Sequence, residues 1–136
     1  MQELRIIIAG GRDFSDFDML QKEINRIIKM IVGTKIPKEL VTIISGCARG
    51  ADTLGEKYAE TYGLKLHRIP ADWERHGNMA GYIRNREMAK FAASVDEEGE
   101  KPRSVLIAFW DGQSRGTKHM IETAKNFKLD VYVVGY

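Results

Sequence analysis

Residues suited to binding an anion are concentrated in four short segments, each of which follows an apolar run. The segments are GGRDFS (10–15), GCARGAD (46–52), PADWERHGN (70–78) and WDGQSRGT (110–117). They hold glycines, aspartates, both tryptophans and four arginines, but no lysine. Arginine offers a planar fork of donors that fits a phosphate or carboxylate, and glycine lets the backbone approach such an anion closely. The pattern predicts an anionic ligand, most simply the phosphate of a nucleotide.

The candidate ligand-binding residues come from three of these segments, together with Ser45 before the second and Arg84 beyond the third. They are Gly10, Gly11, Arg12, Asp13, Ser45, Gly46, Arg49, Gly50, Asp52, Arg84, Trp110, Asp111, Gly112, Ser114, Gly116 and Thr117. Structural roles compete with ligand binding at several of these positions. Glycines also form plain turns, Arg49 and Asp52 also suit a structural pair or a helix cap, and Ser114 also suits helix capping.

Acid–base catalysis would need a carboxylate, and the same segments provide candidates in Asp13, Asp72 and Asp111, with Glu74 as a further choice. Turn and cap roles compete for these side chains. Cys47, the single cysteine, could act as a nucleophile at a helix N-terminus, but no histidine is near in sequence, and we interpret it as a small packing residue.

Trp73 and Trp110 could stack on a nucleotide base or close the rim of a core. The three histidines, His67, His76 and His119, have no metal-ligand spacing. The sequence therefore predicts neither a metal site nor a cofactor.

Apolar runs rich in β-branched residues alternate with segments of helical period along the whole chain. We expect five strands, at 4–9, 41–45, 64–69, 104–109 and 131–134. We expect helices from about Asp16, with Ser15 and Asp18 as its capping pair, and at about 52–62, 79–93 and 114–127. The alternation is typical of an α/β Rossmann-like three-layer sandwich, with a five-stranded, mainly parallel sheet and helices on both faces.

The carboxyl ends of parallel strands meet at one edge of a sheet, where open α/β folds bind ligands. The four anion-binding segments all follow strands and therefore share this edge. The loops of the opposite edge, at 33–39, around Gly63, at 94–103 and near Lys128, are mainly Lys, Glu and Pro.

The 136 residues suit one domain, 1–136, with a sizeable core. Hydrophobic residues make up 43% and charged residues 29%, as in a globular protein, and no apolar run is long enough to cross a bilayer. The N-terminus lacks the features of a signal peptide, and a single cysteine forms no internal disulfide, so we predict a cytoplasmic protein without membrane contact.

A formal charge of +2 is too small to predict nucleic-acid binding. The Walker A and G-x-G-x-x-G motifs are both missing, which disfavours ordinary P-loop NTPases and dinucleotide dehydrogenases.

Five motifs in order resemble the YspA/YpsA-related branch of the SLOG superfamily, over nearly the whole chain. They are GGRDF (10–14), SGCARGAD (45–52), PADW (70–73), AGYIRNREM (80–88) and FWDGQSRGTKHMIETA (109–124). These are Rossmann-like domains related to the Lonely Guy phosphoribohydrolases and to the DNA-processing protein A. The resemblance implies a domain that binds a nucleotide or nucleotide-derived ligand, as a sensor or processing module, with self-association as a further expectation.

Two alternatives follow from the relatives. Lonely Guy enzymes cleave the N-glycosidic bond of a nucleoside monophosphate with a P-G-G-x-G-T-x-x-E loop. Here Gly116 and Thr117 match the G-T, but Met120 stands at the glutamate's position. The RNREM segment resembles the family's upstream arginine motif, which makes Arg84 or Arg86 a candidate ligand contact. The DNA-processing protein, which carries a turn similar to SGCARGAD, binds single-stranded DNA. The first alternative is an N-glycosidic-bond hydrolase, and the second is a single-stranded nucleic-acid module.

Overall fold

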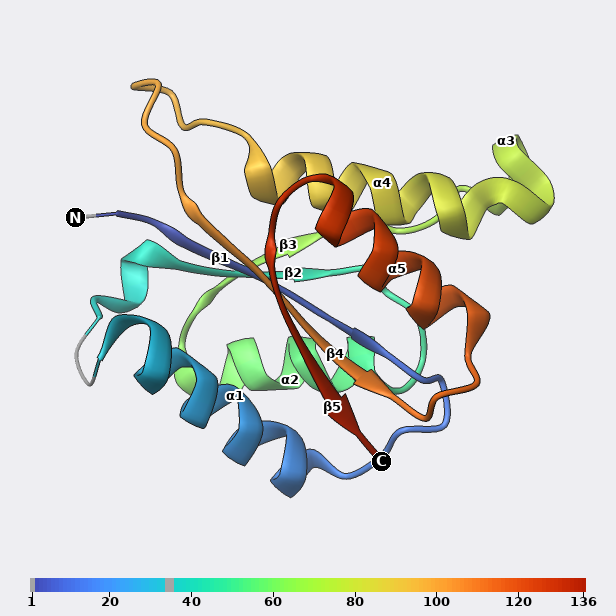
Figure 1. The fold of residues 1–136 in the computed structure, drawn as a ribbon, viewed down its shortest axis with the longest axis horizontal. Helices are drawn as coiled ribbons and strands as arrows, with labels where there is room; N and C mark the ends of the chain where they lie inside the picture. The colour runs from blue at the N-terminus through green and yellow to red at the C-terminus, as the bar shows by residue number, and fades with distance from the viewer. Residues whose placement is uncertain (1, 34–35) are drawn as a thin grey trace.

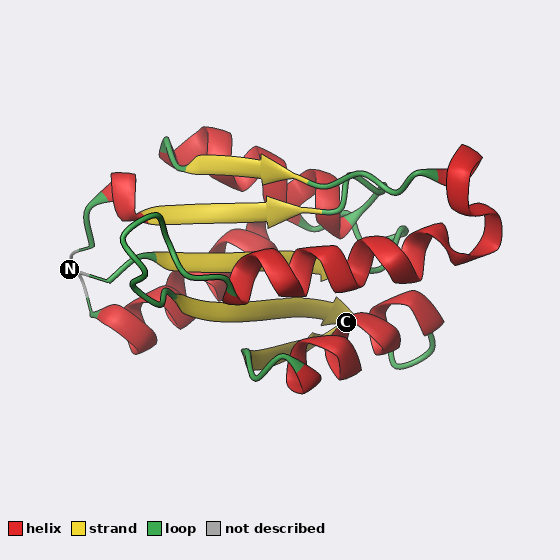
Figure 2. Ribbon diagram, turned by 90° about the horizontal axis from the view of Figure 1, so that it is seen from above, coloured by secondary structure: helices red, strands yellow, loops and turns green. Residues whose placement is uncertain are grey.

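The computed structural model describes residues 2–33 and 36–136, in which five strands form one sheet. The strands are β1 (Leu4–Gly10), β2 (Val41–Ser45), β3 (Lys65–Arg68), β4 (Arg103–Trp110) and β5 (Asp130–Gly135). Their order across the sheet is β3-β2-β1-β4-β5, and every adjacent pair is parallel. Figure 2 shows all five arrows running in one direction. The predicted Rossmann-like α/β architecture is confirmed, with a sheet that is wholly rather than mainly parallel.

Two pairs of helices cover the two faces of the sheet (Figure 1). On one face lie α1 (Phe17–Val32) and α2 (Ala51–Tyr62), and on the other lie α4 (Ala80–Ala93) and α5 (Arg115–Asn126). Right-handed crossovers account for this division, because the chain moves from β1 to β3 in one direction and then returns to build β4 and β5 on the other side.

The central strand β1 is buried on both faces, and its alternating side chains separate two apolar clusters. Ile6 and Ile8 pack with α1 and α2, whereas Ile7 packs with α4 and α5. Helix α1 contributes Leu20, Ile24 and Ile27 from the stripe that the sequence predicts. Burial of β1 fixes its carboxyl end, and the loop that follows it, at the centre of the edge where the carboxyl ends of the strands meet.

Several element boundaries differ from those predicted. The N-cap of α1 is Asp16, which accepts a hydrogen bond from the Met19 N–H at 3.0 Å, so the proposed Ser15–Asp18 capping pair is wrong. The segment 70–78 carries a short helix, α3 (Trp73–His76), followed by the 3₁₀ turn η2 (Gly77–Met79), and another 3₁₀ turn, η1 (Lys38–Leu40), precedes β2. Residues 34–35 of the predicted loop 33–39 lie outside the described residues.

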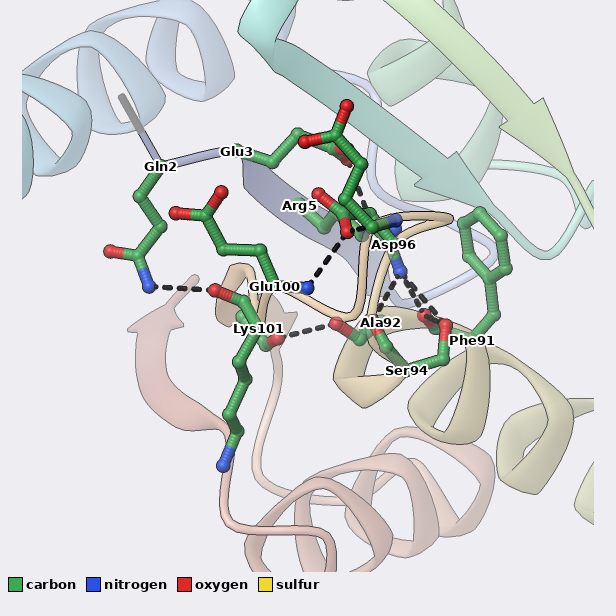
Figure 3. Close-up of polar contacts among 11 residues, drawn as sticks. Gln2, Glu3, Arg5, Phe91, Ala92, Ser94, Asp96, Glu100 and Lys101 are labelled. Carbon is green, nitrogen blue, oxygen red and sulfur yellow. Dashed lines mark hydrogen bonds and ion pairs between the residues drawn. The ribbon is translucent and has the colours of Figure 1, made fainter.

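The buried Arg5 joins the start of β1 to the end of α4 (Figure 3). Its Nη1 donates to the carbonyl oxygens of Phe91 and Ser94 at 2.7 and 3.0 Å, and to the Ser94 hydroxyl at 2.9 Å. Its Nε pairs with Glu3 at 3.0 Å. Carbonyl groups at a helix C-terminus have no partner within the helix, so Arg5 satisfies them and holds α4 against the sheet.

Among the helices of the described residues, none has the length and apolar character that crossing a bilayer requires.

Candidate functional site

A cavity of about 700 Å³ opens at the carboxyl edge of the sheet. It lies between the loops after β1, β2 and β4, the segment α3–α4, and the N-terminus of α5. The chain leaves β1 and β4 toward opposite faces of the sheet at this point, which is where open α/β folds place their ligands. A second cavity of about 370 Å³ adjoins it, and the two share the side chains of Arg12, Arg49, Trp73 and Arg84.

Most of the predicted ligand residues lie around the larger cavity. The structure places there Gly10, Gly11, Arg12, Asp13, Arg49, Asp52, Arg84, Asp111, Ser114, Gly116 and Thr117. It does not place there Ser45, Gly46, Gly50, Trp110 or Gly112, although Gly46 lines the second cavity. The four predicted segments therefore converge, and contact between these residues and a ligand stays a prediction.

The loops after β1 and β2 are packed together through their glycines. The Ala51 N–H donates to the Gly11 carbonyl oxygen at 3.1 Å, and Gly50 adopts a φ of 79° beside it. A Cβ on Gly50 would lie 2.2 Å from that same oxygen, far inside van der Waals contact. Gly50 thus allows the two backbones to meet, which sets the positions of Arg12 and Arg49 at the cavity.

Three arginines line the larger cavity. Arg12 and Arg49 are exposed, whereas Arg84 is half-buried and donates to the carbonyl oxygen of Gly46 and, at 3.1 Å, to the side-chain oxygen of Asn85. Burial lowers the pKa of Arg84. Arg86 is exposed and does not line the cavity, so of the two arginines in RNREM only Arg84 lies at the site.

Helix α5 begins at the cavity and is capped by its own residues. Ser114 Oγ accepts hydrogen bonds from the Thr117 N–H at 3.3 Å and from the Thr117 hydroxyl at 3.1 Å. Asp111 Oδ1 accepts from the N–H groups of Gln113 and Ser114 at 2.8 and 2.9 Å, and these bonds lower the Asp111 pKa. Ser114 therefore performs the capping role, while the N-terminal dipole of the helix favours an anion in the cavity.

Asn85 ties the arginine-bearing helix α4 to α5. It is buried, and its Nδ2 donates to the Gly116 carbonyl oxygen at 3.3 Å and to His119 Nδ1 at 3.1 Å. Burial lowers the pKa of His119, which favours the neutral ring that can accept this bond. Asn85 was missed by the sequence reasoning, although it stands four residues after Gly81 and three before Met88, so helical spacing places all three on the same face.

Asp52 is the buried carboxyl group of the site, with 5% of its surface exposed. Burial raises its pKa from 3.8 to about 6, against the opposing effects of a hydrogen bond from the Ala48 N–H and the charge of Arg84. Gly46 makes room for this arrangement, because a Cβ there would lie 2.9 Å from both the Asp52 carboxylate and the Arg84 guanidinium. A carboxyl group with a pKa near 6 can both accept and release a proton near neutral pH.

The three catalytic candidates have different surroundings. Asp13 lines the cavity, and its Oδ1 accepts a 2.6 Å hydrogen bond from the hydroxyl of Tyr136. Asp111 also lines it, but is held by backbone N–H groups. Asp72 instead caps α3 by accepting from the Arg75 N–H at 3.1 Å, and neither it nor Glu74 lines the cavity. The geometry therefore leaves Asp13 as the best placed of the three.

The aromatic residues at the cavity are Trp73 and Tyr82. Both are exposed and both line it, from α3 and α4 respectively. The Trp110 indole donates to the Ser114 carbonyl oxygen at 3.0 Å and lies outside the lining, so its predicted stacking role does not fit the structure. Tyr82 was missed by the sequence reasoning because a single tyrosine on a helix gives no signal until the helix is placed.

Cys47 lies at the second cavity, in the left-handed region with a φ of 64°. Its N–H donates to Ser45 Oγ at 3.0 Å, and this hydroxyl in turn donates to Glu56 at 2.7 Å. Ser45 is therefore a buried structural residue of the turn rather than part of the cavity wall. Across residues 2–33 and 36–136, no cluster of three or more His, Cys, Asp or Glu side chains is placed to hold a metal ion.

Comparison with known proteins gives one family and one relative. The sequence profile of a family described as "YspA, cpYpsA-related SLOG family" matches residues 4–76, which include β1, β2, β3 and the first two anion-binding segments. The Gene 61 protein of Mycobacterium phage D29 is 33% identical over 144 residues, which cover 96% of each chain. No solved structure shows significant similarity.

Proposed function

The chain belongs to the YspA, cpYpsA-related SLOG family, whose domains have nucleotide-related binding or processing roles, and we propose that it binds a nucleotide in the cavity at the carboxyl edge of its sheet. The observation that carries this proposal is the convergence of Arg12, Arg49 and Arg84 at the boundary between the two cavities. Guanidinium groups that line the same boundary from three different segments suit a phosphate, since each can donate two hydrogen bonds to it.

The phosphate is assigned to the boundary rather than to the whole cavity because of the charge distribution. The larger cavity has three arginines and three aspartates in its lining, so its formal charge is balanced. The lining of the second cavity includes the same three arginines, and none of its described residues is acidic. On the side of the second cavity, the three shared arginines are therefore not balanced by acidic side chains among the described residues.

The nucleoside portion of the ligand then occupies the larger cavity. Trp73 and Tyr82 are 52% and 37% exposed at its rim, so both can offer an aromatic surface to a planar base. Stacking of a base on an aromatic ring contributes about 1–3 kcal/mol and tolerates any base. The volume of about 700 Å³ lies within the range of small-ligand sites.

Thermal unfolding with a panel of nucleoside mono- and diphosphates tests the proposal on wild type, Arg49→Ala and Arg115→Ala. Arg115 is the matched control, because it lies on the same edge but outside the cavity lining. A ligand at 100 times its Kd stabilises the folded state by about 2.7 kcal/mol. We expect this stabilisation in wild type and Arg115→Ala and a much smaller one in Arg49→Ala.

Two results would count against nucleotide binding at this place. Undiminished stabilisation of Arg49→Ala by a nucleotide would show that the nucleotide binds elsewhere on the protein. No stabilisation by any nucleotide would reject the ligand class, and stabilisation by a single-stranded oligonucleotide alone would support the nucleic-acid alternative.

A second candidate function is hydrolysis of the N-glycosidic bond of the bound nucleotide. The observation that favours it is Asp13, whose carboxylate lines the cavity and is oriented by the Tyr136 hydroxyl. Such a carboxylate can stabilise a sugar that develops positive charge. Met120, at the position of the glutamate in the Lonely Guy enzymes, lines the cavity as well, so Asp13 would have to replace that carboxylate. Chromatography of nucleoside monophosphates after incubation should show free base with wild type and none with Asp13→Asn, whereas intact nucleotide throughout would reject hydrolysis.

A further inference from the structure

The geometry points to Asp52 as the residue that recognises a ribose hydroxyl, and hence to a ribonucleotide rather than a deoxyribonucleotide as the ligand. This inference rests on the proposed nucleotide site and adds the sugar to it. The observations behind it are the burial of Asp52, the hydrogen bonding of its two oxygens and its position relative to the arginines.

One Asp52 oxygen is occupied by the protein and the other is not. Oδ2 accepts a hydrogen bond from the Ala48 N–H at 3.2 Å, which closes the loop 46–51 at the start of α2. No described residue donates a hydrogen bond to Oδ1. Every fully buried side-chain oxygen among the described residues has a hydrogen-bond partner, so Oδ1 is not fully buried. Oδ1 must therefore be open to the cavity that Asp52 lines.

The environment of this oxygen makes it a selective acceptor. Asp52 is 95% buried, so a ligand that excludes water from the cavity would leave Oδ1 without a partner unless the ligand itself donates a hydrogen bond. A carboxylate is acceptor-only when ionised and cannot pair with a phosphate, a base carbonyl or another acceptor. The donor it requires is an O–H or N–H, and the ribose of a nucleotide has two neighbouring hydroxyl groups.

Position relative to the phosphate favours a sugar hydroxyl over a base N–H. The Arg84 guanidinium, one of the three arginines at the cavity boundary, and the Asp52 carboxylate both lie within 3 Å of the space that a Cβ on Gly46 would take. A group held next to the bound phosphate is the sugar, because the base is attached on the sugar's other side. Acidic side chains that accept hydrogen bonds from ribose hydroxyls are a recurrent feature of nucleotide-binding α/β folds.

The other cavity carboxylates are less suited to this role. Asp13 is exposed and accepts a hydrogen bond from Tyr136, and Asp111 is exposed and accepts two from the backbone. Water can solvate both of them when a ligand is bound, so their net contribution to selectivity is small. Asp18, which is exposed on α1 and lies outside the lining of both cavities, provides the control variant Asp18→Asn for the loss of one aspartate charge.

The test measures the dissociation constants of the four common ribonucleoside 5′-monophosphates and their 2′-deoxy and 3′-deoxy counterparts by calorimetry at pH 8. A hydrogen bond to a charged acceptor corresponds to about 10- to 100-fold in affinity. We expect wild type and Asp18→Asn to prefer the ribonucleotide by at least about tenfold over one deoxy form. Asp52→Asn keeps an oxygen for Ala48 but replaces the charged acceptor by a neutral amide, so its preference for the ribonucleotide should be several-fold smaller than that of wild type.

The pH dependence provides a second readout. Arg84 from α4, Arg12 from the loop after β1 and Glu56 from the same helix are the charged groups whose fields reach Asp52. With a pKa of about 6, the carboxyl group is protonated at pH 5, and the wild-type preference should fall there toward that of Asp52→Asn.

The outcomes separate the two proposals. Ribo- and deoxyribonucleotides that bind wild type equally would overturn the role of Asp52 and leave the nucleotide site intact. A preference that persists undiminished in Asp52→Asn, or that disappears in Asp18→Asn, would also overturn it. Absence of binding by every nucleotide would overturn the nucleotide site and the ribose contact together.

Discussion

Gly50→Ala should disrupt the contact on which the candidate site is built. Gly50 has a φ of 79° and a ψ of −126°, a combination that L-residues with a Cβ rarely adopt. Its new Cβ would lie 2.2 Å from the Gly11 oxygen and 2.7 Å from the Cα and carbonyl carbon of Arg12. All three atoms belong to the backbone, so no side-chain rotation can relieve the overlap.

The expected loss of stability has two parts. A residue forced into a sparsely populated backbone region costs about 1–3 kcal/mol. Moving one loop away from the other also weakens the hydrogen bond from Ala51 to Gly11, which contributes about 1 kcal/mol. We expect a total of about 3 kcal/mol, a large fraction of the roughly 5–15 kcal/mol that stabilises a domain.

Urea unfolding followed by circular dichroism gives the free energy of unfolding of Gly50→Ala, with two glycine variants as controls. Gly112→Ala has a φ of 81° but no atom within 4 Å of the new Cβ, so it reports the backbone strain alone. Gly116→Ala has neither strain nor overlap and should keep or slightly raise stability, because alanine favours the helical backbone of α5. The reasoning is refuted if Gly50→Ala loses no more stability than Gly112→Ala, because the close approach of the two loops would then carry no cost.

Two further predictions concern buried charged groups. Arg5→Met removes the donor to the Phe91 and Ser94 carbonyl groups and should lower the free energy of unfolding in urea by about 3 kcal/mol. Arg26→Met, at an exposed side chain of α1, should change it by less than about 0.5 kcal/mol, and similar losses in both variants would contradict the capping role of Arg5. The Asp52 pKa is raised in the folded state, so the folded protein binds more protons than the unfolded chain between about pH 4 and pH 6, and stability from this group falls as pH rises through that window. As the pH rises from 4 to 8, the free energy of unfolding of Asp52→Asn should therefore increase by up to about 3 kcal/mol relative to that of wild type. Parallel stability profiles of the two proteins over this range would contradict the raised pKa.

The alternation of strand and helix patterns is strong enough in this chain to predict the architecture. Ile6, Ile7 and Ile8 form a run that only a strand buried on both faces can accommodate, and the period of Leu20, Ile24 and Ile27 fits a helix packed on a sheet. Local errors occurred where competing signals are weak. Ser15 and Asp16 are both good N-caps, and the choice between them depends on the path of the preceding loop, which packs Phe14 against Phe109 at 4.9 Å.

Within the candidate site, the sequence located the segments and the structure selected among their side chains. Arg84 and Arg86 are equal candidates by sequence, but the two-residue offset turns them to different sides of α4, and only Arg84 lines the cavity. Trp73 and Trp110 both follow strands, yet the short helix α3 carries Trp73 to the cavity rim while Trp110 bonds to its own loop.

The sequence by itself determined that this protein is a parallel α/β fold with its candidate anion-binding residues on one edge, because periodicity and strand direction are local properties of the chain. Only the tertiary structure decided which of those residues share a cavity, which hydrogen bonds they make and how their pKa values are shifted. Tyr136 reaches Asp13 across 123 positions of sequence, and Asp52 acquires its raised pKa from burial, which outweighs the opposing charge of Arg84. Both effects arise from contacts between distant segments, which exist only once the sheet has brought the loops together.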